Sequence, residues 1–145
     1  MSNTNHVLYE KDFYAWILAT TELLKTKKFD DLDVEHLVEE IESMGKSERR
    51  QIMTRLGILI AHLLKWQYQP KKRSNSWKLT IKEQRRQIHE LLEESPSLKN
   101  KIETDFQKAY ENAVIIASRE TGIVEEDFLS TCPFDLQLCL DMDYL

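Results

Sequence analysis

The chain has 145 residues, of which 41% are apolar, and 25 acidic residues stand against 20 lysines and arginines. A chain of this size buries enough surface to fold without disulfides or a structural metal, and this composition excludes a disordered or membrane-embedded protein. Only three glycines are present. That is too few for most phosphate-binding loops or for a sheet with many tight turns, so the composition favours long helices.

The N-terminal part of the chain predicts a flexible segment followed by a helix. Residues 1–6 are polar, and residues 1–8 are expected to be flexible. Asp12 is a favourable N-cap for a helix that extends to about Lys27, with apolar residues at helical spacing and lysines near its C-terminal end.

Residues 33–69 form the predicted centre of the fold. Apolar residues at intervals of three and four follow Asp33, which is the pattern of one buried helical stripe. These residues are Val34, Leu37, Val38, Ile41 and Met44. Nearly every position from Leu56 to Leu64 is apolar, which indicates a helix surrounded by other helices. Gly45 leaves two alternatives open: one long, kinked helix, or two helices that meet near residues 45–47.

Three more helices are predicted after Pro70, which ends the central one. The first carries a clean apolar stripe that starts at Trp77. The second begins with Ser95 as cap and ends at Gly122, and a short last helix covers residues 132–140. No long alternation of period two is present, so we predict an all-α, single-domain bundle of about five helices over residues 1–145.

Cys132 and Cys139 are predicted to be free thiols, because seven residues of partly helical chain hold their α-carbons about 10 Å apart, too far for a disulfide. No histidine lies near them, so no zinc site is expected there. The longest apolar run, Ile58–Leu64, is too short to span a membrane. With no signal-peptide pattern at the N-terminus, a cytoplasmic protein without a membrane partner is expected.

Charge is unevenly distributed along the chain. Residues 30–48 hold eight acids and one base, a net charge of −7, whereas residues 65–86 hold eight bases and one acid, a net charge of +7. One interpretation is that these acidic and basic surfaces face each other within the fold or between subunits. Aromatic residues interleaved with bases can also stack on nucleobases while the cations meet phosphates, although a net charge of −5 opposes general affinity for nucleic acid.

The candidate surface for nucleic acid or another partner combines these bases with two tryptophans. Lys78, Lys82, Arg85 and His89 are expected to share one exposed stripe of their helix. The candidate residues are Lys65, Trp66, Lys71, Lys72, Arg73, Trp77, Lys78, Lys82, Arg85 and Arg86.

His62 is the most unusual polar residue, because apolar neighbours surround it in the sequence. A histidine in that setting is usually neutral and hydrogen-bonded within a core. Together with Glu39, Glu40 and Glu42 it forms the candidate polar site, and a hydrolase that uses these groups is the third functional hypothesis. No nucleotide-binding, hydrolase or metalloprotease motif occurs, so no catalytic residue, metal or cofactor is assigned. Asp33 is read as a helix cap.

The order of these motifs resembles a family of uncharacterised, mainly cyanobacterial proteins, filed as domain of unknown function twenty-nine. The resemblance covers nearly the whole chain, from about Tyr9 to Asp143. It implies an all-helical single domain and brings no activity, ligand or catalytic residue. The matching stretches include Tyr9-Glu10-x-Asp12-Phe13-x-x-Trp16, Leu32-Asp33, Glu39-Glu40-Ile41-Glu42-Ser43-Met44-Gly45, Ala61-His62-Leu63-Leu64-Lys65-Trp66, Ser76-Trp77, Gln84-Arg85, Pro96-Ser97-Leu98 and Cys132-Pro133.

These observations favour a non-enzymatic interaction or regulatory module. Its acidic and basic faces would engage protein partners, including a second copy of the chain, because complementary charge guides encounter and orientation. Nucleic-acid binding through residues 65–86 is the alternative.

Overall fold

The computed structural model describes residues 2–145, with side chains from residue 5 onward. In this part of the chain all regular structure is helical, with seven α-helices and three short 3-10 turns, so the all-α class is confirmed and the count of about five helices is too low. The α-helices are α1 (Ser2–Lys11), α2 (Phe13–Lys25), α3 (Val34–Tyr68), α4 (Asn75–Glu94), α5 (Leu98–Thr104), α6 (Phe106–Thr121) and α7 (Leu136–Leu140).

The helix boundaries correct several predictions. The segment expected to be flexible is helical from Ser2, and its first residue lies outside the described part of the chain. Residues 34–68 form one helix, α3, which decides between the two alternatives for the centre. The helix predicted from Ser95 to Gly122 is two helices that meet at Asp105. The last helix is shorter than predicted, because Asp135 caps it through the Leu138 amide.

Two compact units divide the chain, one ending at Ser47 and the other spanning Glu48–Leu145, and α3 contributes to both. The single domain predicted for residues 1–145 therefore stays a prediction, and the units are described separately here as unit 1 and unit 2. None of the described helices is both long and apolar enough to cross a bilayer.

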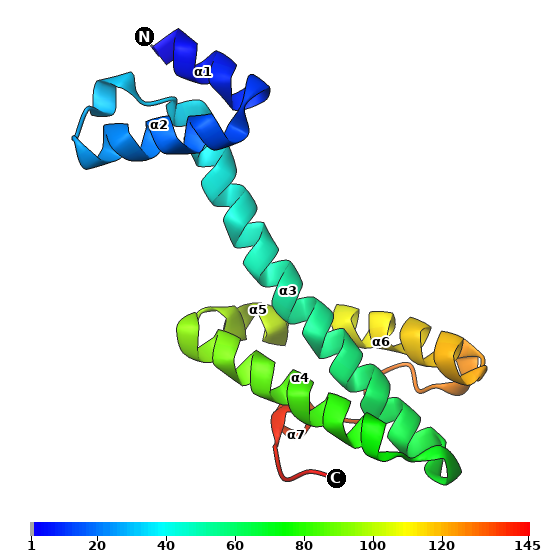
Figure 1. The fold of residues 1–145 in the computed structure, drawn as a ribbon. Helices are drawn as coiled ribbons and strands as arrows, with labels where there is room; N and C mark the ends of the chain where they lie inside the picture. Colours follow the sequence, from blue (N-terminus) through cyan, green and yellow to red (C-terminus); the bar gives the residue numbers. More distant parts are fainter. Residues whose placement is uncertain (1) are drawn as a thin grey trace. The chain divides into compact units, whose positions relative to one another are not determined.

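Unit 1 contains α1, α2 and the first part of α3, with α1 lying against α2 (Figure 1). The predicted N-cap is confirmed, because the Asp12 carboxylate accepts a hydrogen bond of 3.1 Å from the Ala15 amide. Few of the side chains described from residue 5 onward are buried, and most of those are polar; they are Trp16, Thr20, Asp33 and His36. Unit 1 thus has a small and largely polar interior.

Unit 2 is built around the second part of α3, with α4 and α6 lying along it (Figure 1). The apolar run Leu56–Leu64 supplies six of the buried core residues, as expected for a helix surrounded by others. Gly57 faces α6, where an added Cβ would lie 3.8 Å from the Ala109 carbonyl oxygen, an ordinary van der Waals distance. Gly122 ends α6 in the left-handed conformation, with φ of 80°, as its position predicted.

Candidate functional site

A buried cluster of polar side chains joins the three helices of unit 1. Asp33 lies just before α3 and is 6% exposed. Its Oδ2 accepts hydrogen bonds from Trp16 Nε1 at 3.2 Å and from His36 Nδ1 at 2.6 Å. Its Oδ1 lies 3.4 Å from His6 Nδ1. The residue predicted only as a helix cap therefore links side chains from α1, α2 and α3.

The protonation states of this cluster favour a charged pair. Burial by itself would raise the pKa of Asp33, but hydrogen bonds from His36, His6 and Trp16 together hold that pKa below its ordinary value. The hydrogen bond to Asp33 raises the pKa of His36. Because the two shifts are opposite, an aspartate anion and a histidine cation are the forms that this geometry stabilises.

Glu40, one of the predicted site residues, belongs to the edge of the same cluster. The Tyr9 hydroxyl donates to Glu40 Oε1, and this hydrogen bond raises the pKa of Tyr9 to about 12. The Tyr9 ring stacks on His36 with centroids 3.8 Å apart. Glu39 and Glu42, in contrast, are exposed. Of the three predicted acids, Glu40 therefore takes part in a partly buried contact, and the other two do not.

His6, Asp33 and His36 are also the described residues that could hold a metal ion, because their ligand atoms lie within 4.8 Å of one another. The hydrogen bonds already given use both carboxylate oxygens of Asp33. We therefore assign these residues a structural role as a charged hydrogen-bond cluster. From the sequence, the spacing Asp33-x-x-His36 could have indicated that these two side chains lie on the same side of a helix. Nothing in the sequence indicated that His6 lies beside Asp33.

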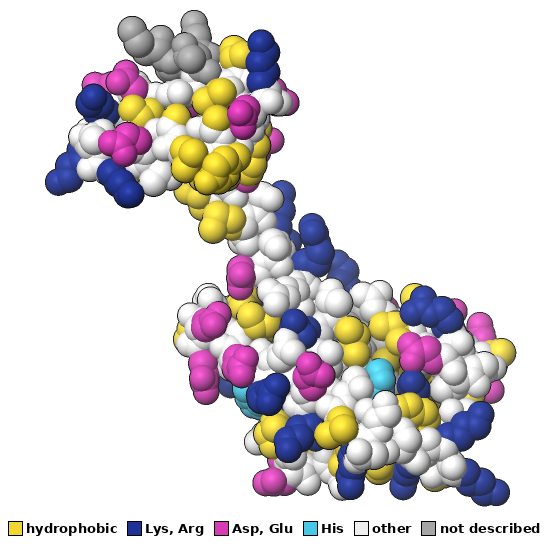
Figure 2. Space-filling view, viewed as in Figure 1, with side chains coloured by type: hydrophobic (Ala, Val, Ile, Leu, Met, Phe, Trp, Pro, Cys, Tyr) yellow, Lys and Arg dark blue, Asp and Glu magenta, His cyan; other side chains and the backbone are white. Residues whose placement is uncertain are grey.

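The stripe predicted to be buried along the start of α3 is exposed. Val34 is 57% exposed, Ile41 60% and Met44 66%, while Leu37 is only half-buried. We call Val34, Val38, Ile41 and Met44 the apolar face of α3. Phe13 and Ile17 of α2 are exposed as well, and Figure 2 shows hydrophobic side chains gathered on this unit. Exposed apolar patches of this kind typically mark interaction sites.

Two of the eight bases assigned to the candidate basic surface are buried in the structure. Lys65 and Arg85 are both buried, which corrects the prediction of an exposed stripe that included Arg85. The other predicted bases remain exposed; they are Lys71, Lys72, Arg73, Lys78, Lys82 and Arg86.

The two tryptophans of that surface are half-buried, and cations of the chain itself cover them. Arg73 lies over the Trp66 ring at 4.9 Å, and Lys65 Nζ lies over the Trp77 ring at 4.8 Å. Ring faces already in contact with a cation offer less area for base stacking. Nucleic-acid binding through this region stays a prediction.

His62 is half-buried on α3 within unit 2. Its Nδ1 donates to the Ile58 carbonyl oxygen at 2.9 Å, and burial lowers the pKa of its ring. His62 is therefore a neutral histidine whose ring hydrogen bond is formed within α3 itself. Glu39, Glu40 and Glu42 belong to unit 1, so neither unit by itself gathers the predicted polar site.

Lys65, which is buried, is held by an ion pair with the more exposed Glu120. Its Nζ lies 2.7 Å from Glu120 Oε1, with the two side chains 8% and 39% exposed. Replacing Glu120 with glutamine should lower the free energy of unfolding by about 1–2 kcal/mol, because Lys65 keeps its charge in a poorly solvated place. Glu111→Gln is the matched control, since Glu111 is exposed on the same helix and forms no described ion pair.

The pH dependence of this effect has a definite sign. The hydrogen bond from Lys65 lowers the pKa of Glu120, so the stability it contributes is present above pH 4.5 and is lost as the pH falls through the folded pKa. Urea unfolding should therefore separate Glu120→Gln from the wild type at neutral pH and much less at about pH 3. An equal loss at both pH values would show that the charge of Glu120 is unimportant.

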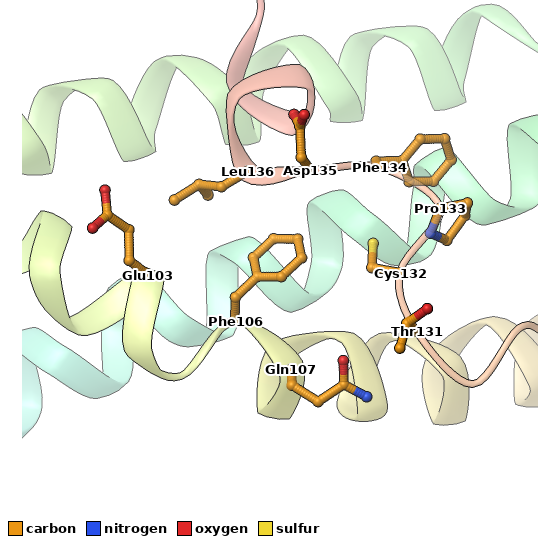
Figure 3. A pocket seen from close by; sticks show the side chains of 9 residues that line it. All are labelled: Glu103, Phe106, Gln107, Thr131, Cys132, Pro133, Phe134, Asp135 and Leu136. Carbon is orange, nitrogen blue, oxygen red and sulfur yellow. The ribbon is translucent and has the colours of Figure 1, made fainter.

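A cavity of about 560 Å³ lies between α6 and the segment before α7 (Figure 3). Cys132 lines it, and Cys139 is buried; both are free thiols, as predicted. A hydrogen bond with Cys139 lowers the pKa of Cys132, so the two thiols lie closer together than their spacing in the sequence predicted. The nearby polar groups are used structurally, because Gln107 donates to the Ser130 carbonyl and Asp135 caps α7. No chemical function is assigned to this cavity.

Comparison with known proteins places this helical chain in one family. The model of a family described as domain of unknown function DUF29 matches residues 8–145, so the chain belongs to that family. No curated protein and no solved structure matches the chain. The family and the all-helical fold expected from the motifs are therefore confirmed, and no relative with a named activity adds a function to them.

Proposed function

We propose that the protein is a non-enzymatic interaction module that self-associates through the apolar face of α3. The observation that carries this proposal is the exposure of Val34, Val38, Ile41 and Met44, each between 47% and 66% exposed. These residues span almost three turns of one helix, a stripe about 15 Å long. Covering such a stripe with another apolar surface removes it from water, which is the main driving force of association.

The charges beside the apolar face support a second copy of the chain as the occupant. Glu35, Glu39 and Glu42 lie along one flank of the stripe, and Lys46 follows on the same flank. When two helices pack antiparallel about a two-fold axis at Ile41, like flanks meet, and Lys46 of each copy lies near Glu35 and Glu39 of the other. In a parallel pair opposite flanks would meet instead, so Lys46 would not face Glu35 and Glu39 of the other copy.

The proposal retains the hypothesis of complementary acidic and basic surfaces, and it assigns them to a specific helix. Nucleic-acid binding and an enzyme that uses His62 remain less favoured predictions, since no contact described above supports either. Cytoplasmic location and a mainly cyanobacterial family are likewise predictions from the sequence.

Ile41→Asp should shift the protein from dimer to monomer. Each two-fold contact would then bury two unpaired carboxylates, so we expect the association constant to fall at least about tenfold. Sedimentation velocity over a range of concentrations measures this change. Val124→Asp is the control, because Val124 is 55% exposed in unit 2 and lies outside the proposed interface.

A second pair of variants tests the antiparallel arrangement. Lys46→Glu alone should weaken the dimer, whereas mixing it with Glu35→Lys/Glu39→Lys should restore association as a heterodimer. A wild-type protein that stays monomeric at every concentration contradicts self-association. A dimer that Ile41→Asp leaves intact contradicts the proposed face.

A further inference from the structure

A second cavity of unit 2 lies between the first turns of α4 and the segment after α7, with a volume of about 370 Å³. Asn75, Lys78, Lys82 and Arg85 line it from α4. Small-molecule sites commonly have volumes of this order, with a few convergent polar groups among apolar ones. Lys78, Lys82 and Arg85 were predicted to form an exposed stripe of α4. In the structure they line a cavity together with the C-terminal segment.

Arg85 has an unusual environment for a cation. The residue is 2% exposed, and its Nε and Nη1 donate at 2.7 Å to the carbonyl oxygens of Cys139 and Tyr144. Its buried Nη2 has no hydrogen-bond partner among the described residues, and no described carboxylate forms an ion pair with it. Burial accordingly lowers the pKa of this guanidinium.

An unpaired buried charge and an unsatisfied donor both oppose folding. Two neutral carbonyls hold Arg85 in place without neutralising it. A guanidinium with a free Nη donor is the group that proteins use to bind carboxylates and phosphates. Because Arg85 lines the cavity, an anionic ligand there would supply the counter-charge that the guanidinium lacks among the described residues.

The rest of the cavity lining adds positive charge and apolar area. Lys78 and Lys82 are exposed, lie one helical turn apart and form no described ion pair. Asp143 is the acidic side chain of the lining, so the side chains alone leave an excess of two positive charges. Leu79 and Met142 are 56% and 46% exposed beside them. The lining thus offers cations for an oxyanion and apolar side chains for the body that carries it.

We propose that this cavity binds a small molecule with a carboxylate or phosphate group on an apolar body, with the oxyanion held by Arg85, Lys78 and Lys82. The site is independent of the self-association face, because its residues all lie in unit 2.

Four probes separate the possible ligand chemistries in a titration followed by backbone and Arg Nε–H NMR signals. Phenyl phosphate and benzoate present the two oxyanions on the same ring, phenol is the neutral control, and inorganic phosphate lacks the apolar body. We expect saturable shifts of the Arg85, Lys82 and Tyr144 signals with at least one aromatic anion. Phenol should give none, and inorganic phosphate should bind more weakly than phenyl phosphate.

Lys82→Gln is the decisive variant, because its exposed side chain can change without affecting the fold. It should weaken binding of the preferred anion about tenfold, as expected for loss of one charged contact. Lys99→Gln, an exposed lysine of α5 outside the cavity, should leave binding unchanged. Arg85→Lys should abolish binding as well, with circular dichroism to verify that the variant remains helical.

Two results would overturn the proposal. One is the absence of saturable binding of either aromatic anion at low ionic strength up to about 10 mM. The other is an equal effect of Lys82→Gln and Lys99→Gln, which would show diffuse attraction to the basic surface.

Discussion

Replacing Leu59 with alanine is expected to lower the free energy of unfolding of unit 2 by about 3 kcal/mol. Leu59 is fully buried on the second part of α3 and belongs to the core cluster that also contains residues of α4 and α6. The substitution removes the transfer free energy of the lost carbons and leaves a cavity that the neighbouring helices cannot fill completely. Urea unfolding followed by circular dichroism measures the difference.

Leu79→Ala provides the matched control, because Leu79 is on α4 of the same unit but is 56% exposed. Its effect should stay within about 0.5 kcal/mol. If both leucine variants lose similar stability, α3 is not the centre of the core.

The apolar run of α3 was predictable because burial on all sides removes any periodic polar face from the sequence. Helix ends were predictable where one residue determines the local geometry, as Asp12 and Gly122 do at α2 and α6. The polar N-terminal segment has no apolar residues at helical spacing, so α1 was not predicted. Its helix depends on contacts such as that between Tyr9 and Glu40, which are 31 residues apart.

The candidate sites were harder to predict, because local pattern does not determine what covers a helical face. The stripe from Val34 to Met44 has the same period as a buried one, yet no described side chain of unit 1 covers it. Arg85 was expected to be exposed and is buried instead. Its burial depends on carbonyl groups 54 and 59 residues later in the chain. Lys65 likewise meets its partner Glu120 across 55 residues.

Asp33→Asn is expected to destabilise unit 1 by about 2 kcal/mol, the order of a hydrogen bond to a charged group. Asparagine is also a good N-cap, so the helix start is preserved while the charge is lost. The variant can still accept from Trp16, but it no longer forms an ion pair with His36. A urea titration followed by the Trp16 indole N–H signal in NMR spectra reports on this unit directly, and Asp30→Asn, an exposed neighbour, is the control.

The pH dependence distinguishes the charged pair from a neutral hydrogen bond. The lowered pKa of Asp33 contributes stability above pH 3.8 that is lost as the pH falls through its folded pKa. The raised pKa of His36 contributes stability that is complete below pH 6.5 and is lost as the pH rises through its folded pKa. The effect of Asp33→Asn should therefore be largest between these values and smaller on either side. A constant effect across this range would mean that Asp33 acts in unit 1 only as a hydrogen-bond acceptor and cap.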